Sequence, residues 1–103
     1  MSSDHTETIE GYVVDLACLR KYPHDALLAR ARIHTRACAL MAHCVESGYG
    51  LVADDGRVLP LDIEATPHVY DALRQSTNDR GIRARVRRIA AGEEMKTSSV
   101  ELL

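Results

Sequence analysis

Apolar and polar residues alternate in the first part of the chain, which is the pattern of a strand with one buried face. Ile9, Tyr12 and Val14 stand among polar neighbours, so we expect a first strand over residues 6–16. Gly11 lies within this segment and indicates a bulge or a sharp bend.

A second pattern follows Pro23, where residues 25–46 are rich in Ala, Leu and Arg and predict a helical region. One face of the expected helix is marked by residues at alternating spacings of 4 and 3, the period of an amphipathic helix. This face consists of Leu27, Ala31, His34, Cys38, Met41 and Val45. His34 and Cys38 are therefore predicted to point toward the core.

Turn-forming residues divide the middle of the chain. Residues 50–62 predict two short strands joined by a tight turn at residues 54–56, Asp-Asp-Gly. Thr66 followed by Pro67 predicts a helix start, because a hydroxyl caps the first turn and proline is favoured at the first helical position. This helix is expected over residues 68–76.

The chain is expected to close with a hairpin of two strands, residues 82–89 and 95–102, around residues 91–92. The fold class predicted from this order is mainly β with helices. It is one OB-like domain over residues 1–103, a five-stranded Greek-key barrel with a helical insert at about residues 18–48, after strand 1. A helix lies between strands 3 and 4. A barrel of another topology, such as an SH3-like one, is the alternative that the helix position disfavours.

Composition narrows the classes of partner. Charged residues make up 27% and apolar residues 46%, and the net charge of -2 gives no whole-chain reason to expect nucleic acid or an anionic membrane. The first residues lack the pattern of a secretory signal, which predicts a cytoplasmic protein, and no apolar run is long enough to span a membrane. In a reducing compartment the 3 cysteines are expected to be thiols, metal ligands or redox groups, with a disulfide as the less favoured alternative.

The candidate chemistry lies in residues 15–48, which hold all 3 cysteines and, of the 5 histidines, His24, His34 and His43. His34 and Cys38 are four apart, so on a helix their side chains are neighbours that can share a metal ion.

Cys44 is harder to place in the same site. On an unbroken helix it would lie about 9 Å along the axis and about 120° around it from Cys38, too far for one ion. A site formed by Cys18, His34, Cys38 and Cys44 therefore requires a break within residues 39–43. His43, beside Cys44, is a substitute ligand.

Three stretches of the chain together resemble a known family. The stretches GYVVDLAC, HCVESGYGLVADDGRVLPLD and RARVRRIAAGEEMKTSSVELL are similar to those of small, largely uncharacterised bacterial OB-fold proteins. That family has a Gly-x-Val-x-Asp-x-x-Cys start and a His/Cys cluster. The resemblance runs from Gly11 to the end; it implies an OB-like barrel with a metal or thiol site, and it places Asp15, Cys18 and Cys44 at matching positions.

Other interpretations of the cluster remain open. Cys38 lies on the expected core face, so simple burial also explains it. Reversible thiol chemistry is a further alternative, although no Cys-x-x-Cys is present. Asp15 is expected to cap the turn that follows it, or to orient a histidine without itself binding the metal. His5 and His68 are expected to be solvated.

A basic segment on the expected fourth strand is the other candidate. Alternation places Arg83, Arg85 and Arg87 on one face, which suits oligonucleotide phosphates in an OB-fold. Ion pairing with Glu93, Glu94 or Glu101 is the favoured explanation of the same pattern.

The function predicted from the sequence is a small metal-binding protein that holds zinc or Cu(I) in a structural, storage or sensing role. A thiol redox protein and an oligonucleotide-binding module are the alternatives. No specific enzyme class is supported, since the chain lacks a Gly-rich phosphate loop and a Ser-His-Asp or paired-carboxylate arrangement. The sequence predicts neither a protein partner nor an oligomeric state.

Overall fold

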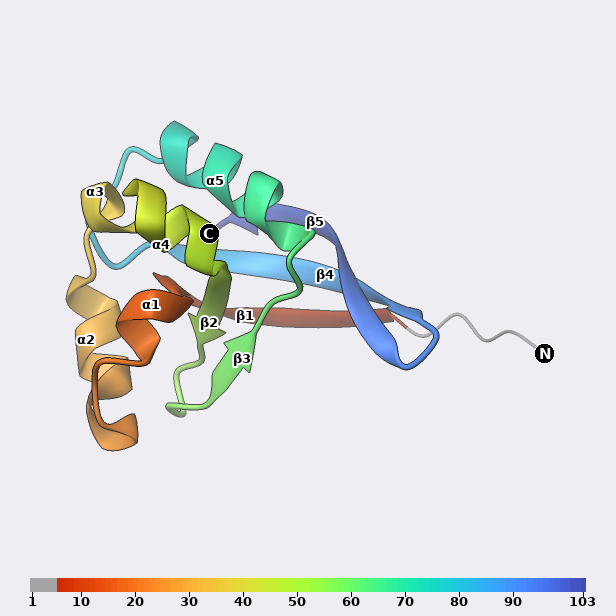
Figure 1. Ribbon diagram of the computed structural model, residues 1–103, viewed down its shortest axis with the longest axis horizontal. Coiled ribbons are helices and arrows are strands. Elements are labelled where there is room, and N and C mark those ends of the chain that lie inside the picture. The colour runs from red at the N-terminus through yellow and green to blue at the C-terminus, as the bar shows by residue number, and fades with distance from the viewer. Residues whose placement is uncertain (1–5) are drawn as a thin grey trace.

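A computed structural model describes residues 6–103 (Figure 1). The strands are β1 (Thr6–Asp15), β2 (Tyr49–Val52), β3 (Val58–Pro60), β4 (Arg83–Ala91) and β5 (Glu94–Leu102). The helices are α1 (Leu16–Leu19), the 3-10 helix η1 (His24–Ala26), α2 (Leu27–Ile33), α3 (Arg36–Ala39), α4 (Ala42–Ser47) and α5 (Ala65–Gln75). Figure 1 shows α1 to α4 gathered at one end of the sheet, away from the N-terminal half of β1.

The strands form one antiparallel sheet in the order β3-β2-β1-β4-β5. The prediction of five strands, with helices after the first strand and between the third and fourth, is confirmed for the described residues. Within residues 6–103, β3 and β5 are the two edge strands of the sheet and do not pair with each other. The sheet is therefore not closed, and the predicted barrel is not confirmed.

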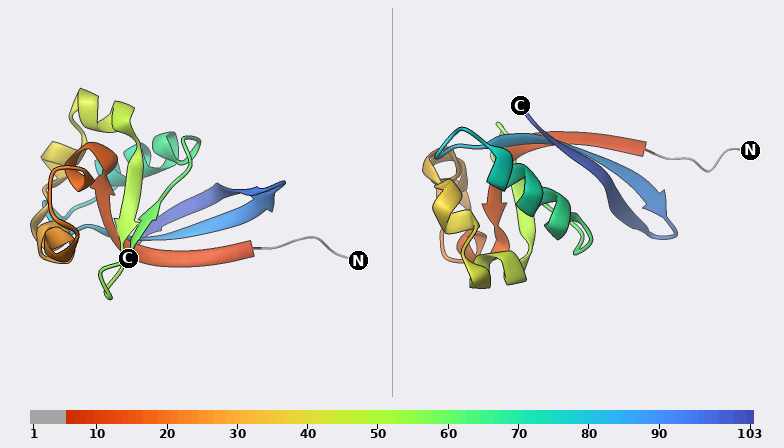
Figure 2. Two further views of the ribbon diagram at one scale, coloured as in Figure 1. Left: turned by 60° about the horizontal axis from the view of Figure 1, so that its bottom comes forward. Right: turned by 90° about the horizontal axis from the view of Figure 1, so that it is seen from above.

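β1 belongs to both halves of the sheet. Residues 6–12 pair with β4 and residues 12–15 pair with β2. The strand bends between these parts (Figure 2). At Gly11 a Cβ atom would lie 2.6 Å from the carbonyl oxygen of Val52, so a side chain does not fit. The predicted bend is present, and it requires glycine because two strands approach closely there.

The end of the sheet nearest the helices is buried on both faces. Successive residues of a strand point to opposite sides, and both Val13 and Val14 of β1 are buried. Val13 lies in the main core with residues of α5, whereas Val14 packs with Val52 and with Ala31 of α2. The α2 part of the helical insert is therefore attached to the sheet by a small apolar cluster of its own, whereas Ala39 of α3 belongs to the main core.

The expected single helix over residues 25–46 is wrong, because the chain leaves the helical conformation at His34. The backbone of His34 is extended, with φ -62° and ψ 129°. Its carbonyl accepts a hydrogen bond from Gly81 N–H (3.1 Å), and Arg36 N–H donates to the Asp79 carbonyl (2.7 Å). These tertiary hydrogen bonds satisfy backbone groups that a continuous helix would have paired internally.

A second break separates α3 from α4. Met41 has ψ 144°, and its side chain is 50% exposed. Met41 of the predicted apolar face is therefore exposed to solvent, whereas Val45 packs against the main core as predicted. The break lies within residues 39–43, where a shared Cys38–Cys44 site required one.

The remaining elements follow the sequence closely. The turn at residues 54–56 joins β2 to β3, and Gly56 adopts φ 87°. α5 begins at Ala65, so Thr66 lies inside the helix and the prediction that Thr66 caps it is wrong. The helix begins earlier because a turn precedes it, in which Ala65 N–H donates to the Asp62 carbonyl (3.0 Å).

Candidate metal centre

Asp15 stands where β1 ends and α1 begins. Its side chain is fully buried. The Oδ2 atom accepts a hydrogen bond from the Cys18 backbone N–H (2.9 Å), which caps α1, and Oδ1 accepts one from His34 Nε2 (2.9 Å). The predicted capping role of Asp15 is thus confirmed, and Asp15 also contacts a histidine.

Cys38 is positioned by the fixed ends of α3. At the start of α3, Thr35 Oγ1 accepts a hydrogen bond from the Cys38 backbone N–H (3.1 Å). At its other end, the buried hydroxyl of Tyr49 donates to the Ala39 carbonyl (2.6 Å). The sequence analysis did not identify Thr35 or Tyr49. The signal for Thr35 was present, because Thr three residues before Cys38 has the spacing of a helix cap.

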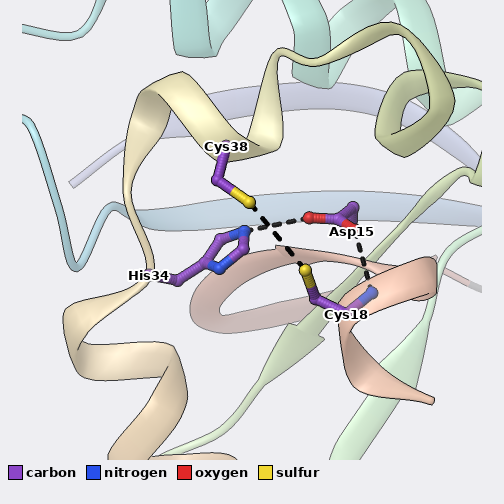
Figure 3. A group of neighbouring side chains, drawn as sticks. All are labelled: Asp15, Cys18, His34 and Cys38. Atoms are coloured by element: carbon purple, nitrogen blue, oxygen red, sulfur yellow. Dashed lines mark hydrogen bonds and ion pairs between the residues drawn. The ribbon is translucent and has the colours of Figure 1, made fainter. Parts of the chain in front are cut away.

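Four side chains from separate segments meet at this point (Figure 3). One ligand atom from each of Asp15, Cys18, His34 and Cys38 lies within 4.8 Å of all the others. In Figure 3 the line between the two sulfurs crosses the line from His34 to Asp15. Four potential ligand atoms this close to one another could hold a single metal ion.

The separations within the group can be compared with such a site. Sulfur ligands bonded at 2.3 Å to one tetrahedral zinc ion lie about 3.8 Å apart. The Sγ atoms of Cys18 and Cys38 are 3.9 Å apart. The 2.9 Å between His34 Nε2 and Asp15 Oδ1 is about 0.4 Å shorter than the separation of two ligands of one ion, so this pair would have to open slightly. The group is thus geometrically able to hold a metal ion.

The sequence predicts that His34 and Cys38 are neighbours on one continuous helix, but in the structure they are not on the same helix. The structure brings them together because α2 ends at Ile33, immediately before His34, and α3 starts at Arg36. Cys44 and His43 lie outside the four-residue group: Cys44 is buried in α4, and its Sγ is 3.5 Å from His43 Nε2. The helix break that Cys44 required is therefore present, but it does not bring Cys44 into this group.

Burial controls the ionisation of these residues. Burial, together with the nearby Asp15 carboxylate, raises the pKa of Cys18 and of Cys44 to about 12. For Asp15, burial alone would raise the pKa, but the hydrogen bonds from His34 and from the Cys18 backbone outweigh it and lower the pKa to about 2. At neutral pH Asp15 is charged, and Cys18 is a thiol unless a cation takes the place of its proton.

The candidate nucleic-acid surface on β4 is largely neutralised by acidic side chains. Arg83 contacts Asp54 at 3.3 Å, and Arg85 contacts Glu10 at 2.7 Å and Glu101 at 2.9 Å. The expected pairing with Glu101 is confirmed. Neither Glu93 nor Glu94 pairs with these arginines in the described residues, because the β4–β5 register places Glu101 opposite Arg85.

The other two arginines of this strand differ. The Arg87 side chain is exposed. The β4–β5 register shifts between Arg87 and Arg88, and Arg88 pairs with Glu7 on β1. Oligonucleotide binding stays a prediction. Arg83 and Arg85, two of the three arginines predicted to contact phosphates, already have acidic partners.

Comparison of the chain with protein-family models, curated proteins and solved structures found no match. The resemblance to small bacterial OB-fold proteins therefore stays a prediction. Across residues 6–103, the helices are all too short or too polar to cross a bilayer.

Proposed function

We propose that this protein binds one Zn²⁺ ion through Asp15, Cys18, His34 and Cys38, in a storage or sensing role. The observation that carries the proposal is the meeting of four ligand atoms within 4.8 Å of one another. Two of them are sulfurs at 3.9 Å, close to the separation that a tetrahedral zinc site requires.

The ligand set favours zinc over Cu(I). Zinc accepts thiolate, imidazole and carboxylate ligands together, whereas Cu(I) prefers soft sulfur ligands. The cluster offers two sulfurs but also a charged carboxylate, which a divalent cation neutralises better than a monovalent one. Cu(I) is the competing ion, and Cys44 is the sulfur that its binding would need to recruit.

A storage or sensing role fits the position of the ligands better than a purely structural one. The main core, built around Leu51, Val69 and Leu73, contains none of the four. Burial of that core does not depend on the ion, so the ion is not the main source of stability, as it is in small zinc-dependent folds. A reversible ion would instead order the helical insert, which supplies Cys18, His34 and Cys38.

The experiment that tests the proposal is elemental analysis of protein purified without a chelator or a metal-affinity tag. We expect about one equivalent of zinc in the wild type, and its loss in Cys18→Ser and Cys38→Ser. Cys44→Ala should keep the zinc, because Cys44 is outside the group although it lies close to Asp15 and Cys38. His68→Ala, on α5, is the control away from these residues. Circular dichroism of each variant checks that its fold is kept. A wild type without metal and with three titratable thiols would overturn the proposal.

A thiol redox function is the second candidate, favoured by the 3.9 Å between the Cys18 and Cys38 sulfurs. A disulfide would need them about 2 Å closer. The raised pKa of Cys18 weighs against it, because the thiolate is the reactive form. Oxidation by glutathione disulfide distinguishes the two: a redox protein gives a reversible Cys18–Cys38 bond in the presence of zinc, whereas a zinc protein is protected by the bound ion.

For the fold, we propose a partly open OB-like barrel. The central position of β1, which pairs with both β2 and β4, supports this assignment, as does the helix between β3 and β4. Amide exchange tests it: a closing contact would protect amides of β3 that point away from β2, and an open sheet would leave them unprotected.

A further inference from the structure

A small pocket opens beside the proposed zinc ligands. Its volume is about 200 Å³. It is lined by Tyr22, Arg30, Ile33, His34, Thr35 and Cys38. Of the four proposed ligands only His34 and Cys38 line it, whereas Asp15 is fully buried. Solvent molecules and small ligands therefore reach the centre from one side.

Arg30, which lines this pocket, has no acidic partner in residues 6–103. The Arg30 guanidinium lies 4.4 Å from the centre of the Tyr22 ring, and this stacking holds it in place. Among residues 6–103 no acidic side chain forms an ion pair with Arg30, in contrast to Arg83 and Arg85. The pocket lining includes no aspartate or glutamate. An anionic group entering the pocket would thus meet a positioned positive charge.

The size of the pocket and the donor preference of a bound zinc ion restrict further which ligands could bind. A pocket of about 200 Å³ is smaller than those that hold drug-sized molecules and admits only a few heavy atoms. At its inner end, a metal held by two thiolates accepts a further soft sulfur donor readily. A ligand that satisfies both ends carries a thiol at one end and a carboxylate at the other.

We propose that this pocket binds a small thiol-carboxylate, with the carboxylate on Arg30 and the sulfur at the metal, and that zinc enters and leaves the centre by exchange with this ligand. The inference rests on the proposed zinc function. In the exchange the ligand thiol would give up its proton to buffer and replace the Cys38 thiolate, which takes up a proton. The chelator would then displace Cys18, His34 and Asp15 in turn, and Cys18 would take up a second proton. No electrons are transferred.

The test measures the rate at which zinc passes from the loaded full-length protein to a chromophoric chelator. The probes are 3-mercaptopropionate, 2-mercaptoethanol and 2-mercaptoethylamine, compared at equal thiolate concentration. They share the thiol and differ in carrying a negative, a neutral or a positive group. We expect 3-mercaptopropionate to accelerate transfer most, by roughly two- to fivefold over 2-mercaptoethanol, the contribution of one exposed arginine–carboxylate pair.

Arg30→Gln should remove this advantage while zinc stoichiometry stays at that of the wild type. Arg32→Gln is the matched control on the same helix: Arg32 is exposed and does not line the pocket, so the variant should keep the advantage. An advantage that survives Arg30→Gln, or equal rates with all three thiols, would overturn the inference and leave the zinc proposal standing. Absence of zinc from the purified wild type, measured first, would overturn both.

Discussion

Two regions of this small protein gather ionisable side chains, and they differ in how the charges are balanced. On the β4 surface, Arg83 and Arg85 contact acidic partners on neighbouring segments. In the candidate metal centre the members are a buried carboxylate, two cysteines and one histidine, with no lysine or arginine among them. In the first region Arg83 and Arg85 already have acidic partners, whereas the second region brings potential metal ligands together without a lysine or arginine. The comparison teaches that clustering of ionisable side chains does not by itself indicate a site, and that the side-chain types in the cluster decide which ligand it could bind.

The largest expected effect comes from removing the buried charge of the metal centre. Asp15→Asn should lower the free energy of unfolding by about 3 kcal/mol, because the hydrogen bonds from His34 and the Cys18 backbone lose their ionised acceptor. Urea denaturation in the presence of a chelator measures this without any contribution from zinc. The same substitution in the other region, Asp54→Asn, should cost less than about 1 kcal/mol, since its pair with Arg83 is exposed. Equal costs at the two positions would remove the distinction between the regions.

Zinc itself should stabilise the protein. At a free zinc concentration 100 times the dissociation constant, the free energy of unfolding rises by about 2.7 kcal/mol, which corresponds to roughly 10–20 °C in the melting temperature of a domain of this size. Calorimetry with and without zinc measures the shift. Cys38→Ser should abolish most of it, while Arg87→Gln on the other region should leave it unchanged. A shift that persists in Cys38→Ser would show that zinc binds elsewhere.

The pH dependence of stability sharpens the comparison further. The pKa of Asp15 falls from 3.8 to about 2 on folding, so its ionised form stabilises the folded state above pH 4, and this contribution is lost as the pH falls through 2. It amounts to about 2 kcal/mol, of which about half is gone at pH 3. The difference in unfolding free energy between wild type and Asp15→Asn, measured without zinc, should shrink accordingly from pH 6 to pH 3. A constant difference would mean that Asp15 does not titrate in this range.

The smallest expected effect concerns nucleic acid. Because acidic side chains occupy Arg83 and Arg85, the wild type should bind labelled single-stranded DNA weakly at physiological salt, with a dissociation constant of about 100 µM or higher. Glu10→Gln combined with Glu101→Gln frees Arg85 and should tighten binding severalfold, with a steeper dependence on salt. Fluorescence anisotropy measures both. Tight binding by the wild type would restore the oligonucleotide interpretation.

Much of the sheet could be predicted from sequence, because its signals are local. Alternating apolar residues fix the strands, the Asp-Asp-Gly turn fixes one hairpin, and Gly11 marks the bend in β1. Closure of the sheet could not be predicted in this way. It depends on whether β3 and β5, which are far apart in the sequence, meet at their edges, and no local pattern reports that.

The site illustrates the same limit. Three members of the group, Cys18, His34 and Cys38, were among the predicted ligands because cysteine and histidine are rare and their concentration in one segment is informative, whereas the predicted Cys44 and His43 lie outside the group and Asp15 was not predicted as a ligand. Their geometry was predicted from a continuous helix, whereas His34 and Thr35 are drawn out of that helix by residues 79–81. Hydrogen bonds between segments more than 40 residues apart leave no periodic trace in the sequence, so the break at His34 and the pocket beside it appear only in three dimensions.

The bend of β1 restricts where residues can be inserted into or deleted from this chain. Glu7 and Glu10 on one half of β1 pair with arginines of β4, and Asp15 at the other end belongs to the metal centre. Between them Gly11 stands where no side chain fits. Since inserting or deleting one residue in a strand reverses the direction of every side chain beyond it, such a change between Glu10 and Asp15 would preserve one region only by disrupting the other. Insertions and deletions should therefore be tolerated in the loops of this chain and not within β1 between Glu10 and Asp15.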